Sequence, residues 1–277
     1  MKVCICTTPI RPEPTEFPPF GSMAIIQSLE SIGTEAEFYH LDYHRQSDEQ
    51  MKKYFVNNQF DIVGISAVVS TAYKFTKKLA SIIKNANPGT IIIIGGGLAT
   101  SAKILHEKCS VDYCVFGDGE KIICNLVKLI INDELNEDNL VKCKGISFYN
   151  TNNEFIFTGY DSPPSADEIS TPDYNILENI GCLDHYIGQE PYWLKGYGID
   201  YEKSNKTNAT LISTKGCVAK CTFCQRGSKG YNVYDLDKFE AYIKDLKQSI
   251  EKKQQVFMLK NTKIELRGDS HHGKSAM

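Results

Sequence analysis

The sequence predicts an α/β protein that begins with a doubly wound, mainly parallel sheet. From residue 2 to about residue 132, short apolar runs alternate with segments of helical periodicity, an order typical of βαβ units. The unbroken run of isoleucines at 91–94 suits a central strand that helices cover on both faces. A second βα unit is expected to begin at residues 209–213 and to continue through a loop with three clustered cysteines at 217–224.

The strands and helices of the first part can be placed from their apolar residues. Two helices carry such residues at spacings of three and four, so each presents one apolar face to the sheet. These faces consist of Ala72, Phe75, Leu79, Ile82, Ile83 and Ala86 in one helix and of Ile122, Ile123, Leu126, Leu129 and Ile130 in the other. The expected strands are residues 3–7, 36–40, 62–66, 91–94 and 113–116.

The sequence changes character after about residue 132. We interpret the acidic stretch at 132–138 as a helix-ending loop, and two β-rich runs around a polar turn predict a hairpin within 145–160. A connector rich in proline, serine and aspartate follows. The last region is expected to contain a strand at 209–213, a helix at 236–250 capped by Asp235, and a final strand at 256–259. We therefore expect three regions, residues 1–135, 136–208 and 209–277.

Composition and charge exclude several classes of protein. With 277 residues and 42% apolar content, the chain can bury real cores. A net charge of −3 gives no general attraction to nucleic acid or anionic membranes, and no segment is long enough to cross a bilayer. The N-terminus lacks the apolar stretch of a signal peptide, and the ten cysteines are spread over a long chain. We therefore expect a cytoplasmic protein with reduced thiols.

Three loops with glycines follow the third, fourth and fifth expected strands. Because ligands of an open parallel sheet bind outside the carboxyl ends of its strands, these loops predict one shared site. Glycine lets a bulky ligand approach the backbone, and a serine adds a compact hydroxyl donor. An ordinary strand–helix turn is the alternative for any single loop. The candidate ligand-binding residues are Ser66, Ala67, Val68, Gly95, Gly96, Gly97, Gly117, Gly119 and Glu120.

The spacing of these loops resembles a known signature. Ser66-x-Val68 is separated from Gly95-Gly96 by 26 residues, similar to the S-x-L…GG pattern of cobalamin-binding domains, with Val68 in place of leucine. Residues 17–33 and 111–120 resemble segments of the N-terminal domain of cobalamin-dependent radical S-adenosylmethionine (SAM) enzymes. The resemblance implies a flavodoxin- or Rossmann-like cobalamin-binding domain, in which the nucleotide tail of cobalamin lies along the serine and glycine loops.

One feature of many cobalamin domains is missing. They carry D-x-H-x-x-G after the first strand, where the histidine ligates cobalt, whereas residues 7–21 here contain no histidine. Asp42 and His44 match part of this motif but follow the second strand, and Ser47 stands at its glycine position. We interpret His44 as a surface or structural histidine and expect no protein histidine on cobalt. The alternative is a pocket that has lost cobalamin and serves as a docking scaffold.

The clustered cysteines Cys217, Cys221 and Cys224 have the spacing C-x3-C-x2-C. Three thiolates can hold three irons of a [4Fe–4S] cluster and leave the fourth iron open, whereas structural zinc needs four ligands. A zinc site or a redox-active thiol is the alternative. The spacing resembles the radical SAM motif C-x3-C-x-Φ-C, with Phe223 as the aromatic residue. The other seven cysteines are expected to be core thiols.

This second resemblance implies the chemistry of radical SAM enzymes. In that family the amino acid part of SAM chelates the open iron, and the reduced cluster cleaves the sulfonium to a 5′-deoxyadenosyl radical. The implied fold is a partial TIM barrel that begins after the connector. Such a barrel needs more βα units than residues 209–277 supply, so we expect a C-terminally truncated barrel that contains only the first unit or units.

Two function classes follow from these interpretations. The first is a cobalamin-dependent radical SAM enzyme, for methyl transfer or related radical chemistry, with an incomplete catalytic domain. Its substrate would be an unknown small molecule or peptide, and its electron donor a protein such as flavodoxin or ferredoxin. The second is a non-catalytic cobalamin-binding module with a vestigial iron–sulfur loop. Neither class needs a nucleic acid or a membrane as partner.

Overall fold

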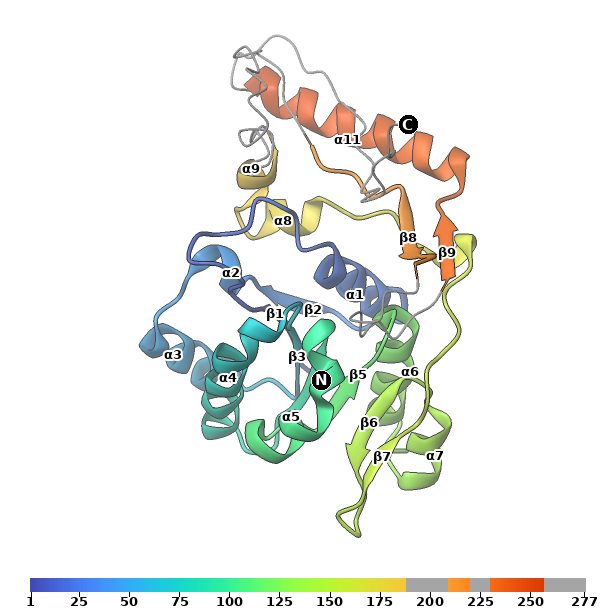
Figure 1. The fold of residues 1–277 in the computed structure, drawn as a ribbon. Helices are drawn as coiled ribbons and strands as arrows, with labels where there is room; N and C mark the ends of the chain where they lie inside the picture. Colours follow the sequence, from blue (N-terminus) through green and yellow to red (C-terminus); the bar gives the residue numbers. More distant parts are fainter. Residues whose placement is uncertain (188–208, 220–229, 257–277) are drawn as a thin grey trace, which may run out of the picture. The chain divides into compact units, whose positions relative to one another are not determined.

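The computed structural model describes residues 1–187, 209–219 and 230–256, and they divide into two compact units. Among these residues, the first unit comprises 1–15, 19–163 and 218–219. The second unit comprises 16–18, 164–187, 209–217 and 230–256. Figure 1 shows the helices and strands of both units. No described helix is both long and apolar enough to span a membrane.

The first unit is built on a seven-stranded sheet with the order β2-β1-β3-β4-β5-β6-β7. The first five strands along the chain pair in parallel, which confirms the predicted doubly wound sheet, and each lies within one residue of its predicted bounds. The strands are β1 (Val3–Thr7), β2 (Ala36–Tyr39), β3 (Ile62–Ser66), β4 (Ile91–Gly95), β5 (Tyr113–Val115), β6 (Ile146–Tyr149) and β7 (Phe155–Phe157).

Helices cover both faces of this sheet (Figure 1). On one side α1 packs against α6, and on the other α4 packs against both α3 and α5. Short 3-10 turns precede α4 and α5. The helical elements are α1 (Phe20–Ser31), α2 (Leu41–His44), α3 (Asp48–Asn58), η1 (Ser70–Ala72), α4 (Tyr73–Ala86), η2 (Gly97–Ser101), α5 (Ala102–Cys109), α6 (Gly119–Ile131) and α7 (Glu137–Lys142).

The isoleucine strand β4 occupies the centre of the core. Ile92 and Ile94 belong to the hydrophobic cluster that includes residues of α3, α4 and α5, while Ile93 is also buried. Because side chains alternate along a strand, Ile93 points to the opposite face, so helices shield β4 on both sides. Burying one such side chain contributes roughly 1.5–3 kcal/mol. The sequence therefore placed the centre of the sheet correctly.

The predicted hairpin forms, but it extends the sheet. Strand β6 pairs antiparallel with both β5 and β7, so the hairpin adds two antiparallel strands to the end of the sheet. The prediction of a plain loop at 132–138 was wrong at its end, because α7 begins at Glu137. Its N-cap is Asn136, whose side chain accepts a hydrogen bond of 3.0 Å from the Asn139 N–H.

The second unit contains a small antiparallel sheet and several helices. Strands β8 (Thr214–Cys217) and β9 (Gly230–Val233) pair with each other. The buried Tyr174 donates its hydroxyl hydrogen to the Thr210 carbonyl, and Tyr234 donates to the Ser170 carbonyl at 3.4 Å. The other elements are η3 (Ala166–Glu168), α8 (Asn175–Asn179), α9 (Leu183–Tyr186) and α11 (Leu236–Val256).

Two predictions for this unit need correction. The strand expected at 209–213 lies instead at β8, and its partner β9 runs antiparallel to it. Helix α11 begins as predicted, with Asp235 accepting a 3.0 Å hydrogen bond from the Lys238 N–H, but it continues to Val256. Val256 therefore ends a helix and does not start a strand, and residues 257–259 lie outside the described part of the chain.

Candidate functional site

The carboxyl ends of the parallel strands meet at one edge of the first unit. Thr7 of β1 pairs in register with Ser66 of β3, which pairs with Gly95 of β4. Strand β5 lies beside β4 in the same direction. The loops after β3, β4 and β5 therefore gather at this edge, which we call the carboxyl edge, as the sequence predicted.

Gly96 and Gly97 make the close approach of two of these loops possible. Gly96 has a φ of +88°, and a Cβ atom there would lie 2.6 Å from the carbonyl oxygen of Ala67. A Cβ atom on Gly97 would collide with the carbonyl oxygen of Val68. The Leu98 N–H donates to the Ala67 carbonyl at 3.0 Å and holds the loops together. These two glycines thus allow the loops to pack closely, and their contact with a ligand stays a prediction.

Gly95 is different, because a Cβ atom there would meet no atom of the described residues within 4 Å. Beside it, the half-buried Ser66 makes no side-chain hydrogen bond with any other described residue. Val68 exposes 53% of its surface at the same edge. An open glycine, an available hydroxyl and an exposed apolar side chain thus lie at the carboxyl edge, and we call these three residues the cradle. Their chemistry suits contact with a partly apolar ligand.

The loop after β5 contributes mainly backbone geometry. Gly117 has a φ of +90°, a conformation that favours glycine. A Cβ atom on Gly119 would lie 3.0 Å from Ile25 of α1, so Gly119 brings α6 close to α1. Glu120 lies in the first turn of α6, whose N-terminus faces the carboxyl edge. Of the three predicted positions here, only Gly117 lies in the loop itself.

His44 and Asp42 have separate roles. His44 is exposed at the end of α2, in agreement with a surface histidine. Asp42 is buried, and its carboxylate accepts hydrogen bonds from residues of the loop after β1. The sequence indicated only that Asp42 matches part of a motif in the wrong place, and it did not predict this contact.

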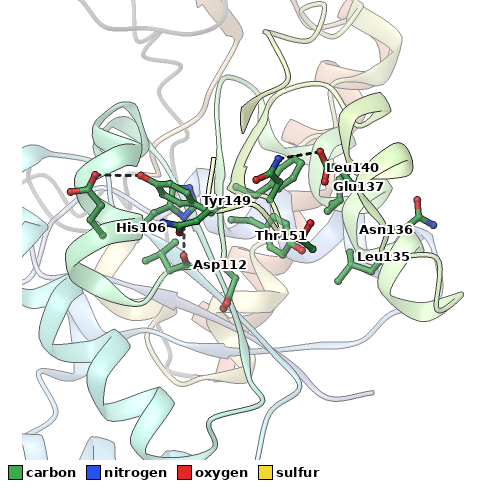
Figure 2. Close-up of a pocket in the computed structure, with 14 residues that line it drawn as sticks. His106, Asp112, Leu135, Asn136, Glu137, Leu140, Tyr149 and Thr151 are labelled. Carbon is green, nitrogen blue, oxygen red and sulfur yellow. Dashed lines mark hydrogen bonds between the residues drawn. The ribbon is translucent and has the colours of Figure 1, made fainter. Parts of the chain in front are cut away.

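A cavity of about 970 Å³ lies near the beginning of β5, on the side of the sheet away from the carboxyl edge, which we call the amino edge (Figure 2). It is lined by residues that precede β5, such as Asp112, and by the hairpin turn, so it is remote from the carboxyl ends. Burial lowers the pKa of His106, and the neutral ring donates from Nδ1 to the Val111 carbonyl at 2.8 Å. Its Nε2 lies 3.0 Å from the Ser147 hydroxyl. Both nitrogens are therefore used structurally.

Most cysteines lie in the core, as predicted. Six of the seven outside the triad are buried, and Cys124 is half-buried and donates to the Ser28 carbonyl at 3.2 Å. Burial raises the pKa of Cys114 to about 12 and that of Cys143 to about 11. Thiols with such values are almost fully protonated at neutral pH, which makes them poor nucleophiles.

The predicted iron–sulfur loop is only partly described. Cys217 is the half-buried last residue of β8. Cys221, Phe223 and Cys224 lie outside the described residues, so the convergence of the three thiols stays a prediction. Within the described part of the chain, no group of three histidine, cysteine, aspartate or glutamate side chains is arranged to hold a metal ion.

Comparison with known proteins identifies the fold of the first unit. The family described as B12 binding domain matches residues 13–127. These residues are therefore similar to a B12-binding domain. All predicted ligand-binding positions of the three loops, from Ser66 to Glu120, fall within it. The domain's β1 strand begins ten residues before the matched region, at Val3.

Curated relatives extend the similarity beyond the B12-binding domain. The chain is 27% identical over 207 residues to an anaerobic magnesium-protoporphyrin IX monomethyl ester cyclase of Rubrivivax gelatinosus, a match that covers 72% of this chain and 34% of the relative. A cyclase of the same name from Cereibacter sphaeroides is 24% identical over 237 residues, covering 83% and 35%. The chain thus spans about a third of the length of these relatives.

Solved structures share the fold at low identity. The cobalamin-dependent SAM radical enzyme OxsB with aqua-cobalamin bound matches with a TM-score of 0.71 and 17% identity, covering 97% of this chain and 34% of that one. The radical SAM methyltransferase TsrM from Kitasatospora setae, with cobalamin and a [4Fe–4S] cluster bound, matches with a TM-score of 0.58 and 14% identity, covering 96% and 48%. The chain therefore resembles radical SAM proteins that contain a cobalamin-binding domain, as the sequence predicted.

Proposed function

We propose that this chain contains the cobalamin-binding part, and the beginning of the catalytic part, of a cobalamin-dependent radical SAM enzyme. The observation that carries the proposal is the cradle at the carboxyl edge, where Gly95 leaves open space beside the available hydroxyl of Ser66. This cradle lies within the B12-binding domain. The matched region contains the loops of the carboxyl edge, which supports the proposal.

The residues of the cradle would act by binding and orientation. Ser66 would donate its hydroxyl hydrogen to a polar group of the nucleotide tail, while Val68 would contact an apolar part. Gly95 would let the tail lie close to the backbone. When bound, cobalamin supplies a carrier for a methyl group. No histidine follows β1 within residues 7–21, so we propose that the protein places no imidazole on cobalt.

The cysteine loop would hold the second cofactor. Cys217, Cys221 and Cys224 would ligate three irons of a [4Fe–4S] cluster, and Phe223 would lie beside it. When bound, cluster and SAM together supply a radical that abstracts hydrogen from substrate. The electron would come from a donor such as flavodoxin or ferredoxin. The substrate would be a small molecule or a peptide.

The reaction subtype is best proposed broadly, as methyl transfer or related radical chemistry. The curated relatives carry the name of a cyclase, whereas one structural neighbour is named a methyltransferase. Residues that differ between such reactions would lie in the catalytic part, of which this chain covers little, because it spans about a third of its relatives. A non-catalytic cobalamin-binding module is the second candidate, and the described cradle fits it equally well.

The first experiment tests cobalamin binding by the purified chain. Hydroxocobalamin is titrated and followed by absorbance, and the Co(II) form is examined by electron paramagnetic resonance. We expect saturable binding without nitrogen splitting from a protein imidazole, and the same affinity for His44→Ala. Absence of binding would contradict the proposal as a whole. Imidazole splitting would contradict the absence of a histidine ligand.

A second experiment separates the enzyme from the binding module. After anaerobic reconstitution with iron and sulfide, we expect a [4Fe–4S] absorbance that is lost in Cys217→Ala, Cys221→Ala and Cys224→Ala. Cys124→Ala is the matched control, because this half-buried thiol lies in α6 and not in the cysteine loop, so the absorbance should be unchanged. Zinc in place of iron, or unchanged iron in Cys221→Ala, would favour the module. Release of 5′-deoxyadenosine from SAM after reduction would favour the enzyme.

A further inference from the structure

The loop that follows β1 occupies a place at the carboxyl edge that the preceding proposal leaves without a role. Residues 8–15 follow the carboxyl end of β1 directly, next to Ser66 of β3. Three of these eight residues are prolines, which lack the N–H group needed for backbone hydrogen bonds. Side chains from elsewhere must therefore supply much of what holds this loop in place.

The carboxylate of Asp42 is the first such side chain. It exposes only 3% of its surface. Its Oδ1 accepts from the Ile10 N–H at 3.3 Å, and its Oδ2 accepts from the Thr15 N–H at 3.0 Å and from the Thr15 hydroxyl. One buried carboxylate thus binds both ends of the loop.

The guanidinium of Arg45 belongs to the second side chain that holds the loop in place. Its Nη1 donates to the Arg11 carbonyl at 2.7 Å, and its Nη2 donates to the Glu13 carbonyl at 2.6 Å. Nη2 also lies 2.9 Å from Asp42 Oδ1, and Nε donates to the Asp42 carbonyl at 2.6 Å. The planar fork of arginine suits this pattern, whereas a lysine ammonium could not make all of these bonds from one position.

The backbone of Arg45 adds an independent observation. Arg45 caps α2 with a φ of +49°, in the left-handed region that arginine rarely adopts. Glycine or asparagine would cap the helix with less strain. The strained conformation is retained together with a side chain that bonds the loop, and strain of this kind often accompanies a functional constraint.

The loop is also tied directly to the cradle. The Thr8 hydroxyl donates to the Ser66 carbonyl at 3.1 Å, and the Asp42 N–H donates to the Thr7 hydroxyl at 3.0 Å. A change in the loop would therefore reach the residue that we propose as a ligand donor. Thr7 itself is in register with Ser66 and Gly95.

We infer that Asp42 and Arg45 are positioning residues that fix residues 8–15 as a rigid wall of the cobalamin site. This inference rests on the proposed function. The wall is formed before the ligand arrives, so binding does not have to order the loop. It stands where other cobalamin domains place their histidine-bearing loop. The partial motif around Asp42 thus supplies the orientation of a loop and not a metal ligand.

The test compares Arg45→Asn with Arg45→Lys. Asparagine tolerates the left-handed backbone and removes the guanidinium, so the variant should fold. Lysine keeps the positive charge and has a backbone preference like that of arginine, but its ammonium lacks the planar set of donors of the guanidinium. If the freed loop adopts the binding conformation about a tenth of the time, hydroxocobalamin affinity falls about tenfold. We expect this fall for Arg45→Asn and a smaller one for Arg45→Lys. Lys78→Asn, which breaks an exposed 2.6 Å ion pair with Asp48, is the control and should bind like the wild type.

Limited proteolysis without ligand provides a second readout. Arg45→Asn should be cut within residues 8–15 faster than the wild type and Lys78→Asn, while its melting temperature changes by only a few degrees. The inference is overturned if the wild type binds hydroxocobalamin and Arg45→Asn binds it equally well. If Arg45→Asn loses affinity only in proportion to a general loss of folded protein, the inference is also overturned. If the wild type does not bind, the proposed function fails first and the inference with it.

Discussion

The two edges of the first unit's sheet differ in a way that volume alone would misrepresent. The amino edge contains a cavity of about 970 Å³, but its polar side chains largely bond one another: Tyr149 donates to Glu107 at 3.3 Å, and Asn150 donates to Glu137 at 3.3 Å. The carboxyl edge offers the available Ser66 hydroxyl, an open Gly95 and an exposed Val68. Binding capacity is better indicated by groups that await a partner than by empty space.

The largest effect expected at the carboxyl edge is on folding. Gly96→Val would place a β-branched side chain at a φ of +88° and within 2.6 Å of the Ala67 carbonyl oxygen. We expect the free energy of unfolding to fall by roughly 3 kcal/mol from backbone strain and overpacking together. Urea denaturation measures this fall in the free energy of unfolding. A loss below about 0.5 kcal/mol, the usual range for surface changes, would show that the two loops can separate at little cost.

Gly95→Val sharpens the comparison, because the adjacent glycine should show the opposite behaviour. A Cβ atom there meets no atom within 4 Å in the part of the chain that the structure describes, so stability should change by less than about 1 kcal/mol. Cobalamin affinity should fall about tenfold, since overpacking a site costs on the order of 1–3 kcal/mol. Gly89→Val is the matched control at the amino edge and should leave affinity unchanged. Equal affinities of Gly95→Val and the wild type would remove Gly95 from the site.

The amino-edge cavity can be filled to test whether it takes part in binding. Thr151 lines the cavity from the exposed hairpin turn, so Thr151→Trp should occupy part of it without disturbing the core. We expect cobalamin affinity to stay within about twofold of the wild type, because only the carboxyl edge binds the ligand. The titration used for Gly95→Val measures this as well. A clear loss of affinity would mean that the two edges have been assigned the wrong way round.

The smallest expected effect is the pH dependence of stability that His106 contributes at the amino edge. Burial lowers the pKa of His106 in the folded protein, so the unfolded chain takes up a proton at a higher pH than the folded one does. The stability that neutral His106 contributes is therefore present above the unfolded pKa of about 6.5 and is lost as pH falls towards the folded pKa. Melting temperatures at pH 7.5 and 5.5 should differ more for the wild type than for His106→Gln. An identical pH dependence in both would contradict this account.

Periodicity predicted the first unit well because its signals are local. Strand β4 is four isoleucines and a glycine, and α4 repeats apolar residues every three or four positions, so both patterns survive without tertiary information. Helix α7 was missed because it has only six residues and begins in an acidic stretch that reads as a loop. The strand of the second unit was misplaced by several residues, since β8 contains a lysine, a glycine and a cysteine and has no alternating pattern.

The candidate site divides in the same way. Ser66, Gly95 and Gly96 could be singled out because strand ends and glycines are visible in the sequence. The role of each glycine could not be predicted, because the collision of a Cβ atom at Gly96 with Ala67 depends on how close the two loops come after folding. Asp42 and Arg45 show the same limit, since they meet residues 8–15 only when α2 packs beside the end of β1.

The sequence by itself determined the doubly wound sheet, the edge where its loops gather and the residue types available there. These follow from local periodicity and from the rule that parallel strands end together. Only the tertiary structure decided that Gly95 is open while Gly96 is packed against another loop. It also decided that the hairpin pairs with β5, and that a buried carboxylate and an arginine hold the loop after β1. The physical reason is that steric room and hydrogen-bond partners are properties of atoms brought together from distant positions, and no local pattern encodes them.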